Sequence, residues 1–186
     1  LGSNRLEGTF PSQIGSLETL ERLVIFSNSL GGPLPSQLGL LAQLTSIRAF
    51  DNPFSTGMIP SQLGSLESLE FLSLRSTQRE GSLPTEIGRL SALTYLDLRS
   101  NSLKGELGAV ASLAAAQSLL LNFNSFSGPL PNLATLTQLA SIQLFDCALT
   151  GKLADLGMER LTALTSFRAS GNAFVGPIPL QLASLS

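Results

Sequence analysis

The chain has 186 residues with a formal charge of −2, an apolar fraction of 43% and only 13% charged residues. This composition can bury a core, but its acidic balance lacks the basic stripe that a nucleic-acid interface needs. The longest apolar run, 113–121, is interrupted by Gln117 and Ser118, so no segment approaches the roughly 18 apolar residues of a membrane span. We therefore expect no nucleic-acid partner and no membrane contact within this chain.

Leucine opens a new unit at nearly constant intervals along the whole sequence. The intervals between the opening residues are 24, 25, 24, 23, 23, 25 and 24 residues, and these residues are Leu17, Leu41, Leu66, Leu90, Leu113, Leu136, Leu161 and Leu185. A fixed period of this length is typical of a solenoid in which each unit forms one coil. We expect a single domain over 1–186, with a partial unit at 1–16 and seven units from 17 to 184. Because both cut ends carry ordinary core positions, we also expect a fragment of a longer array.

Within each unit, a stretch of the form LxxLxLxx alternates with period two, which predicts a short strand with one buried face. About 20 residues return to the next strand, so neighbouring strands must be parallel. A Leu/Ile-Pro pair then predicts an extended segment followed by a short 3₁₀ piece, such as Ser36–Leu40.

An asparagine follows the strand in most units, and its amide can bond the backbone of its own turn and of a neighbouring turn. We predict a structural ladder of these side chains, formed by Asn28, Asn52, Asn101, Asn124 and Asn172. Thr77 and Cys147 replace Asn in two units, where each can donate one weaker bond. We expect Cys147 to be a buried free thiol with a structural role.

Several units depart from the repeat. Arg79 occupies a position that is Leu30 or Leu103 elsewhere, so a core position is lost there or only its stem is buried. One extra residue beside Pro53 predicts a bulge at the strand exit. The unit from Leu90 lacks the Pro, and the unit from Leu136 has an extra residue near Gly157.

The consensus LxxLxLxxNxLxGxIPxxLGxLxxL resembles the plant-type leucine-rich repeat of receptor kinases and polygalacturonase-inhibitor-like proteins. It stands almost intact as LTYLDLRSNSLKG at 93–105 and SFRASGNAFVGPIPLQLASL at 166–185. With the handedness of parallel crossovers, the resemblance implies an α/β solenoid. This is a right-handed leucine-rich-repeat arc with parallel strands on the concave face and short 3₁₀ or irregular segments on the convex face.

The resemblance also implies a binding function and an extracellular or cell-surface location. No Asn lies in an N-x-Ser/Thr sequon, however, which departs from glycosylated plant receptor ectodomains. An algal, protist, bacterial or intracellular relative therefore stays open.

Ligand contacts in a solenoid come from the non-consensus strand positions, which point outward on the concave sheet. Those positions are rich in Phe, Tyr and Arg, the residue types that dominate interface hot spots. We therefore predict a ligand-binding surface for a protein or an extended peptide, made of Phe26, Arg48, Phe50, Phe71, Arg75, Tyr95, Asp97, Arg99, Phe123 and Phe145.

Arg75 and Arg99 hold the same outward column in adjacent units, so their stems start about 4.8 Å apart. Together they could grip an anion of an acidic partner, with Phe50, Phe71 and Tyr95 as apolar anchors. The alternative is an internal salt bridge, in which Asp97 pairs with one of the two.

Catalysis has little support, because the chain has no histidine for a triad or for most transition-metal sites. Asp51 and Asp146 share a column, but four strand spacings place them about 19 Å apart, beyond the roughly 5–9.5 Å of a glycosidic acid pair. We predict no enzymatic activity, no cofactor and no metal.

Two other binding functions remain as alternatives. The chain could be a fragment of the ligand-sensing ectodomain of a cell-surface receptor, or it could bind ice or a polysaccharide surface. Ice binding would need flat ranks of identical residues. The best rank is broken, reading Glu21, Thr45, Glu70, Thr94, Gln117, Ala140 and Thr165.

Overall fold

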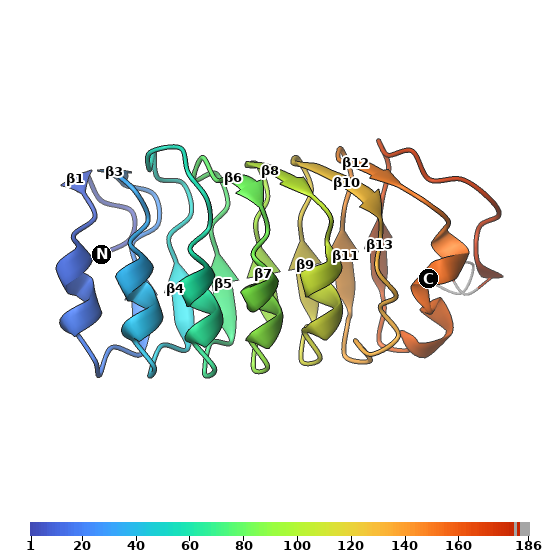
Figure 1. Ribbon diagram of the computed structural model, residues 1–186, viewed down its shortest axis with the longest axis horizontal. Coiled ribbons are helices and arrows are strands. Elements are labelled where there is room, and N and C mark those ends of the chain that lie inside the picture. Colours follow the sequence, from blue (N-terminus) through green and yellow to red (C-terminus); the bar gives the residue numbers. More distant parts are fainter. Residues whose placement is uncertain (181, 183–186) are drawn as a thin grey trace.

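The computed structural model describes residues 1–180 and 182, so the opening Leu185 of the last unit lies outside the described residues. Its coils stack side by side along one axis, in the order of the sequence (Figure 1). None of the described helices is long and apolar enough to cross a membrane.

One side of the solenoid is a parallel sheet of seven short strands, and its outer surface is the concave face. The strands are β2 (Arg22–Val24), β4 (Ser46–Arg48), β5 (Phe71–Ser73), β7 (Tyr95–Asp97), β9 (Ser118–Leu120), β11 (Ser141–Gln143) and β13 (Ser166–Arg168). Neighbouring strands are in register, so that Leu72 pairs with Leu96 and Leu96 with Leu119. The predicted parallel strands and the solenoid fold are confirmed.

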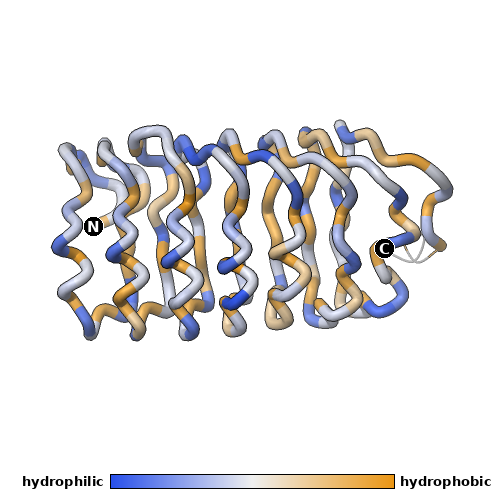
Figure 2. The backbone as a smooth tube through the Cα atoms, viewed as in Figure 1, coloured by the Kyte–Doolittle hydropathy of each residue, from blue (hydrophilic) through white to orange (hydrophobic). Residues whose placement is uncertain are grey.

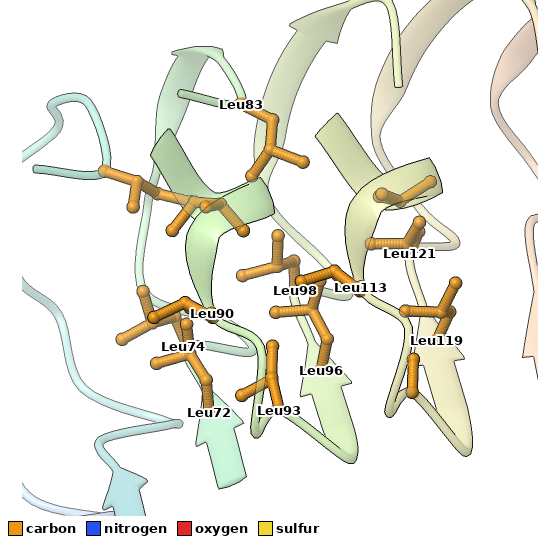
Figure 3. Close-up of a cluster of buried hydrophobic side chains, with 14 of the residues drawn as sticks. Leu72, Leu74, Leu83, Leu90, Leu93, Leu96, Leu98, Leu113, Leu119 and Leu121 are labelled. Atoms are coloured by element: carbon orange, nitrogen blue, oxygen red, sulfur yellow. The ribbon is translucent and has the colours of Figure 1, made fainter. Parts of the chain in front are cut away.

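The core is a stack of leucines between this sheet and the opposite side of each coil. Leu72, Leu96 and Leu119 come from successive strands and are almost fully buried (Figure 3). Hydrophobic positions recur at equivalent places in successive coils (Figure 2). Because each fully buried Leu contributes about 1.5–3 kcal/mol relative to exposure, this repeated burial is the main force that stacks the coils.

The side facing away from the concave face carries short 3₁₀ helices, as the sequence predicts. They are η1 (Ser12–Ser16), η2 (Ser36–Leu40), η3 (Ser61–Ser65), η4 (Thr85–Arg89), η5 (Gly108–Ser112), η6 (Leu153–Leu156) and η7 (Met158–Arg160). A proline with extended backbone precedes each of the first four. A Cβ on Gly39 would collide with the carbonyl oxygen of Gln62 in the next coil, so Gly lets these helices pack closely.

The Asn side chains link adjacent coils through their amides. Asn52 Nδ2 donates to the carbonyl oxygens of Ala49 in its own turn (3.0 Å) and Ile25 in the preceding coil (2.9 Å), while its Oδ1 accepts the N–H of Leu30 (3.2 Å). Asn28, Asn101, Asn124 and Asn172 repeat this pattern.

Both replacements in the ladder make fewer bonds. Thr77 donates only within its own turn, to the carbonyl oxygen of Leu74 at 2.6 Å. The thiol of Cys147 lies 3.6 Å from the carbonyl oxygen of Leu121. It is free but only partly buried, which corrects the expectation of a fully buried thiol. That burial raises the pKa of Cys147 above its ordinary value.

A second parallel sheet lies beside the Asn ladder, where the repeat pattern predicts only irregular segments. It contains β6 (Glu80–Ser82), β8 (Ser102–Gly105), β10 (Ser125–Pro129) and β12 (Ala148–Thr150), and a separate pair is formed by β1 (Glu7–Thr9) and β3 (Ser29–Gly31). These strands lie along one edge of the solenoid (Figure 1).

The gap between those two parts falls at the coil with the extra residue beside Pro53. In place of a strand, this coil has only an isolated bridge between Gly57 and Arg79. The Arg79 side chain is 1% exposed, so it is buried to its end, beyond the predicted partial burial of its stem. Its guanidinium donates to the carbonyl oxygens of Thr77 (2.9 Å) and Ser55, and burial lowers its pKa.

Candidate ligand-binding surface

An open hollow of about 250 Å³ lies across β4, β5 and β7 on the concave face. Seven of its lining residues belong to the predicted binding surface, and the eighth is Ser73; the seven are Arg48, Phe50, Phe71, Arg75, Tyr95, Asp97 and Arg99. The short strands bring these side chains together because outward positions of adjacent coils lie one strand spacing apart.

Two aromatic pairs are stacked along the solenoid axis. The ring centroids of Phe26 and Phe50 are 4.6 Å apart with an interplanar angle of 6°, and those of Phe71 and Tyr95 are 4.3 Å apart at 3°. Parallel rings this close are stacked with an offset, so each ring covers one face of its partner while all four side chains stay partly exposed. The edge of an aromatic ring carries its positive partial charge, which favours contact with ligand oxygens.

Arginines cover the remaining faces of two of these rings. The guanidinium carbon of Arg48 lies 4.4 Å from the centroid of Phe71, and that of Arg75 lies 5.1 Å from the centroid of Phe50. Both contacts are cation–π interactions that hold an arginine in a fixed place on the concave face.

Arg99 forms a bidentate ion pair with Asp97, with both N–O distances at 2.9 Å. The Asp97 side chain is only 5% exposed beneath this guanidinium. The carboxylate of Asp97 is therefore covered and bonded within the protein, and its role as a ligand contact stays a prediction. The hydrogen bond from Arg99 to Asp97 raises the pKa of Arg99.

Arg75 also has an acidic partner, Asp51 of the preceding coil. Asp51 has a left-handed backbone, with φ of 54°, a conformation that also occurs directly before Asn28, Asn101 and Asn124. Sequence reasoning missed this pair, although Asp51 and Arg75 lie one repeat apart. The internal salt bridge, weighed as the alternative for one arginine, is therefore present for both. An anion gripped jointly by Arg75 and Arg99 would have to compete with two protein carboxylates.

Tyr95 lines the hollow and is half-buried. Burial raises the pKa of its phenol, and the nearby carboxylate of Asp97 raises it further. The hydroxyl therefore stays protonated at physiological pH and can donate a hydrogen bond to a ligand.

Phe123 and Phe145 do not join this hollow. They lie on the two coils that follow it, where their rings meet edge to face with centroids 5.0 Å apart. Phe123 is 50% exposed. A separate open hollow begins at Phe145 and continues to Phe167 and Arg168.

A third hollow, of about 380 Å³, lies beside the first on the concave face and shares Arg48 and Phe71 with it. Its other lining residues are Arg22, Val24, Thr45, Ser46, Glu70 and Thr94. The predicted ligand contacts did not include Arg22, although it occupies the same strand position as Phe71 and Tyr95. Residues 1–180 and 182 hold no group of three or more His, Cys, Asp or Glu side chains arranged for a metal ion.

The repeated coil, its parallel sheet and its Asn ladder define a leucine-rich-repeat solenoid. The ectodomain of the Arabidopsis receptor kinase HAESA, in complex with the peptide hormone IDA and the co-receptor SERK1, is similar over all of this chain and 31% of its own, with 33% identity and a TM-score of 0.93. The ectodomain of the receptor kinase SOBIR1 from Arabidopsis thaliana is 31% identical over 66% of this chain and 68% of its own, with a TM-score of 0.60. The chain belongs to the plant-type leucine-rich-repeat family.

A plant ice-binding protein is also similar, with 26% identity and a TM-score of 0.85 over all of this chain and 60% of its own. A scan against protein-family models and a search among curated proteins both give no match. The chain spans about a fifth to a third of the length of the receptor ectodomains GASSHO1/SCHENGEN3 and HAESA.

Proposed function

We propose that the chain is a single-domain binding module that holds an extended peptide, free or as part of a partner protein, on its concave face. The hollow across β4, β5 and β7 carries this proposal, because it gathers aromatic and arginine side chains in one open site. Such side chains supply most of the binding energy in protein interfaces. The similar HAESA ectodomain is in complex with a peptide hormone, which supports the same use here.

Membership of this family supports the proposal that the chain belongs to the extracellular ectodomain of a cell-surface receptor. The similar solved structures include receptor-kinase ectodomains, and the candidate hollow gathers aromatic and arginine side chains suited to binding a partner. We therefore propose a ligand-sensing role without enzymatic activity in this segment.

Ice binding is a second candidate because of the similar plant ice-binding protein. However, the threonines of the best candidate rank on this chain already form hydrogen bonds within the protein. The hydroxyls of Thr45, Thr94 and Thr165 each donate to a backbone carbonyl oxygen of the preceding coil, at 3.1, 3.0 and 3.1 Å. A rank with bonded hydroxyls and interposed Glu side chains fits a peptide surface better than an ice plane.

The test is selection of randomised decapeptides on the purified chain, followed by affinity measurement on variants. We expect Phe71→Ala with Tyr95→Ala to weaken the best peptide at least tenfold, because the stacked pair lines the hollow. Gln62→Ala, on η3 at the opposite side, should change affinity less than twofold. Equal affinity in all three proteins would reject the concave face. Thermal hysteresis without any peptide selected would favour ice binding.

A further inference from the structure

Another open hollow, of about 410 Å³, lies beside the second sheet, next to the coil that forms no strand there. Three successive coils line it. They contribute Thr56 from the strandless coil, Ser76 and Gln78 from the next coil, and residues 100–102 from the third. None of these residues lines the hollow across β4, β5 and β7, so the two sites are distinct.

Buried polar groups hold the walls of this hollow in place. The guanidinium of Arg79, whose side chain is 1% exposed, donates to the carbonyl oxygens of Ser55 and Thr77. Both acceptors are chain neighbours of residues that line the hollow, so one buried side chain fixes two walls. The amide oxygen of Asn101 accepts the N–H groups of Thr77 and Arg79, at 3.1 and 2.9 Å. The hollow is therefore preformed, and a ligand loses little binding energy to ordering it.

The hollow is lined by neutral hydrogen-bonding groups. Five of its six lining side chains form no hydrogen bond with any residue that the structure describes, and these are Thr56, Ser76, Gln78, Ser100 and Ser102. The sixth, Asn101, uses its amide in the ladder. Within residues 1–180 and 182, no charged, aliphatic or aromatic side chain lines the hollow. Such a lining offers no counter-charge to an ion, and an apolar ligand would deprive the hydroxyls of their water.

We propose that this hollow binds a neutral saccharide unit, which belongs to a free oligosaccharide or to a glycan on a partner protein. Each sugar hydroxyl donates one hydrogen bond and accepts others, as the Ser and Thr hydroxyls do, and the amide of Gln78 adds two donors and an acceptor. A saccharide can therefore take over the hydrogen bonds that water makes to these side chains. The site does not depend on the peptide proposed for the concave face.

The chemistry of the lining predicts how binding responds to salt. Screening by salt weakens contacts between charges and leaves neutral hydrogen bonds almost unchanged. Saccharide affinity at this hollow should therefore be the same at low and high ionic strength. A ligand held by the arginines of the concave face should instead bind more weakly as the salt concentration rises.

The test is a titration of the isotopically labelled chain with neutral trisaccharides of glucose, galactose, mannose and xylose, followed by amide NMR shifts. We expect at least one trisaccharide to give saturable shifts at Ser76, Gln78 and Ser100, with a dissociation constant in the millimolar range. The same trisaccharide attached to a glycine–serine peptide distinguishes the two sources. Equal affinity identifies the saccharide alone as the ligand, and at least tenfold tighter binding identifies a glycan on a protein.

Thr56→Val combined with Ser102→Ala removes two hydroxyls from exposed positions and should weaken the saccharide at least fivefold. Ser125→Ala is the matched control, because Ser125 follows Asn124 as Ser102 follows Asn101 but does not line the hollow. It should change the affinity less than twofold. The amide spectrum of each variant shows in the same experiment that the chain is folded.

Three results would overturn the inference. They are the absence of saturable shifts with tens of millimolar of every trisaccharide, tighter binding of trigalacturonate than of any neutral trisaccharide, and unchanged affinity in the double variant. Each would leave peptide binding on the concave face in place, because that face is tested with different ligands and different variants.

Discussion

Arg79 donates a hydrogen bond from its guanidinium to the carbonyl oxygen of Ser55, across one coil of the solenoid. Its Nε donates to the carbonyl oxygen of Thr77, and the side chain fills a position that is leucine or phenylalanine in other coils. The coil with the extra residue beside Pro53 is thus tied to the next coil by a buried cation in place of a strand.

Arg79→Met should lower the free energy of unfolding by about 1–3 kcal/mol, because the stem is kept while the charged hydrogen bonds are lost. Amide hydrogen exchange over residues 54–57 should become faster. Arg89→Met, on the exposed side of η4, should stay within about 0.5 kcal/mol of the unaltered protein. Unchanged exchange in the Arg79 variant would mean that other contacts hold the loop.

Cys147→Asn should raise the free energy of unfolding by about 0.5–1.5 kcal/mol per hydrogen bond gained. By the register of Asn124, the new amide would donate to the carbonyl oxygens of Leu121 and Leu144 and accept the N–H of Phe126. Cys147→Ala is the control and should not be stabilised. Chemical denaturation measures both, and a midpoint for the Asn variant below that of the Ala variant would contradict the ladder model.

The Cys147 thiol should react slowly with iodoacetamide in the folded protein. Burial raises its pKa, so at pH 8 less of the reactive thiolate is present than in the unfolded chain. The folded state therefore favours the protonated thiol, and this contribution to stability is lost as the pH rises through the folded pKa. Alkylation at pH 8 should be at least tenfold faster in guanidinium chloride, and equal rates would show an accessible thiol.

The two ion pairs of the concave face should differ in strength. The side chains of Arg75 and Asp51 are 35% and 36% exposed, so their coupling should be about 0–1 kcal/mol. Asp97 is 5% exposed and bonded at two points, so its coupling with Arg99 should exceed that value. Double-mutant cycles with Ala at each pair measure both couplings. A stronger Arg75–Asp51 pair would contradict the burial argument.

The concave sheet and the Asn positions could be predicted from the sequence because the strand pattern recurs in register with the Asn. The second sheet could not, because segments such as Ser102–Gly105 lack the alternating LxxLxL pattern of the concave strands and pair only when neighbouring coils stack. The stacked ring pairs could be predicted, because the two residues of each pair occupy the same outward position in adjacent coils, one strand spacing apart.

The charge pairing of the candidate site was harder to predict. The left-handed backbone at Asp51 places its carboxylate beside Arg75. A sequence alignment of the coils treats this position as extended strand and therefore does not predict the contact. Arg48 was predicted as a ligand contact. Only the structure shows that Arg75 and Arg99 have acidic partners, whereas Arg48 forms no ion pair with any of the described residues.

The most direct measurement of concave-face binding is a crystal structure of the chain with its tightest selected peptide. We predict an extended peptide across β4, β5 and β7, in contact with the Phe71–Tyr95 pair. A peptide bound to the second sheet or to the 3₁₀ helices, with the concave hollow open to solvent, would contradict the account.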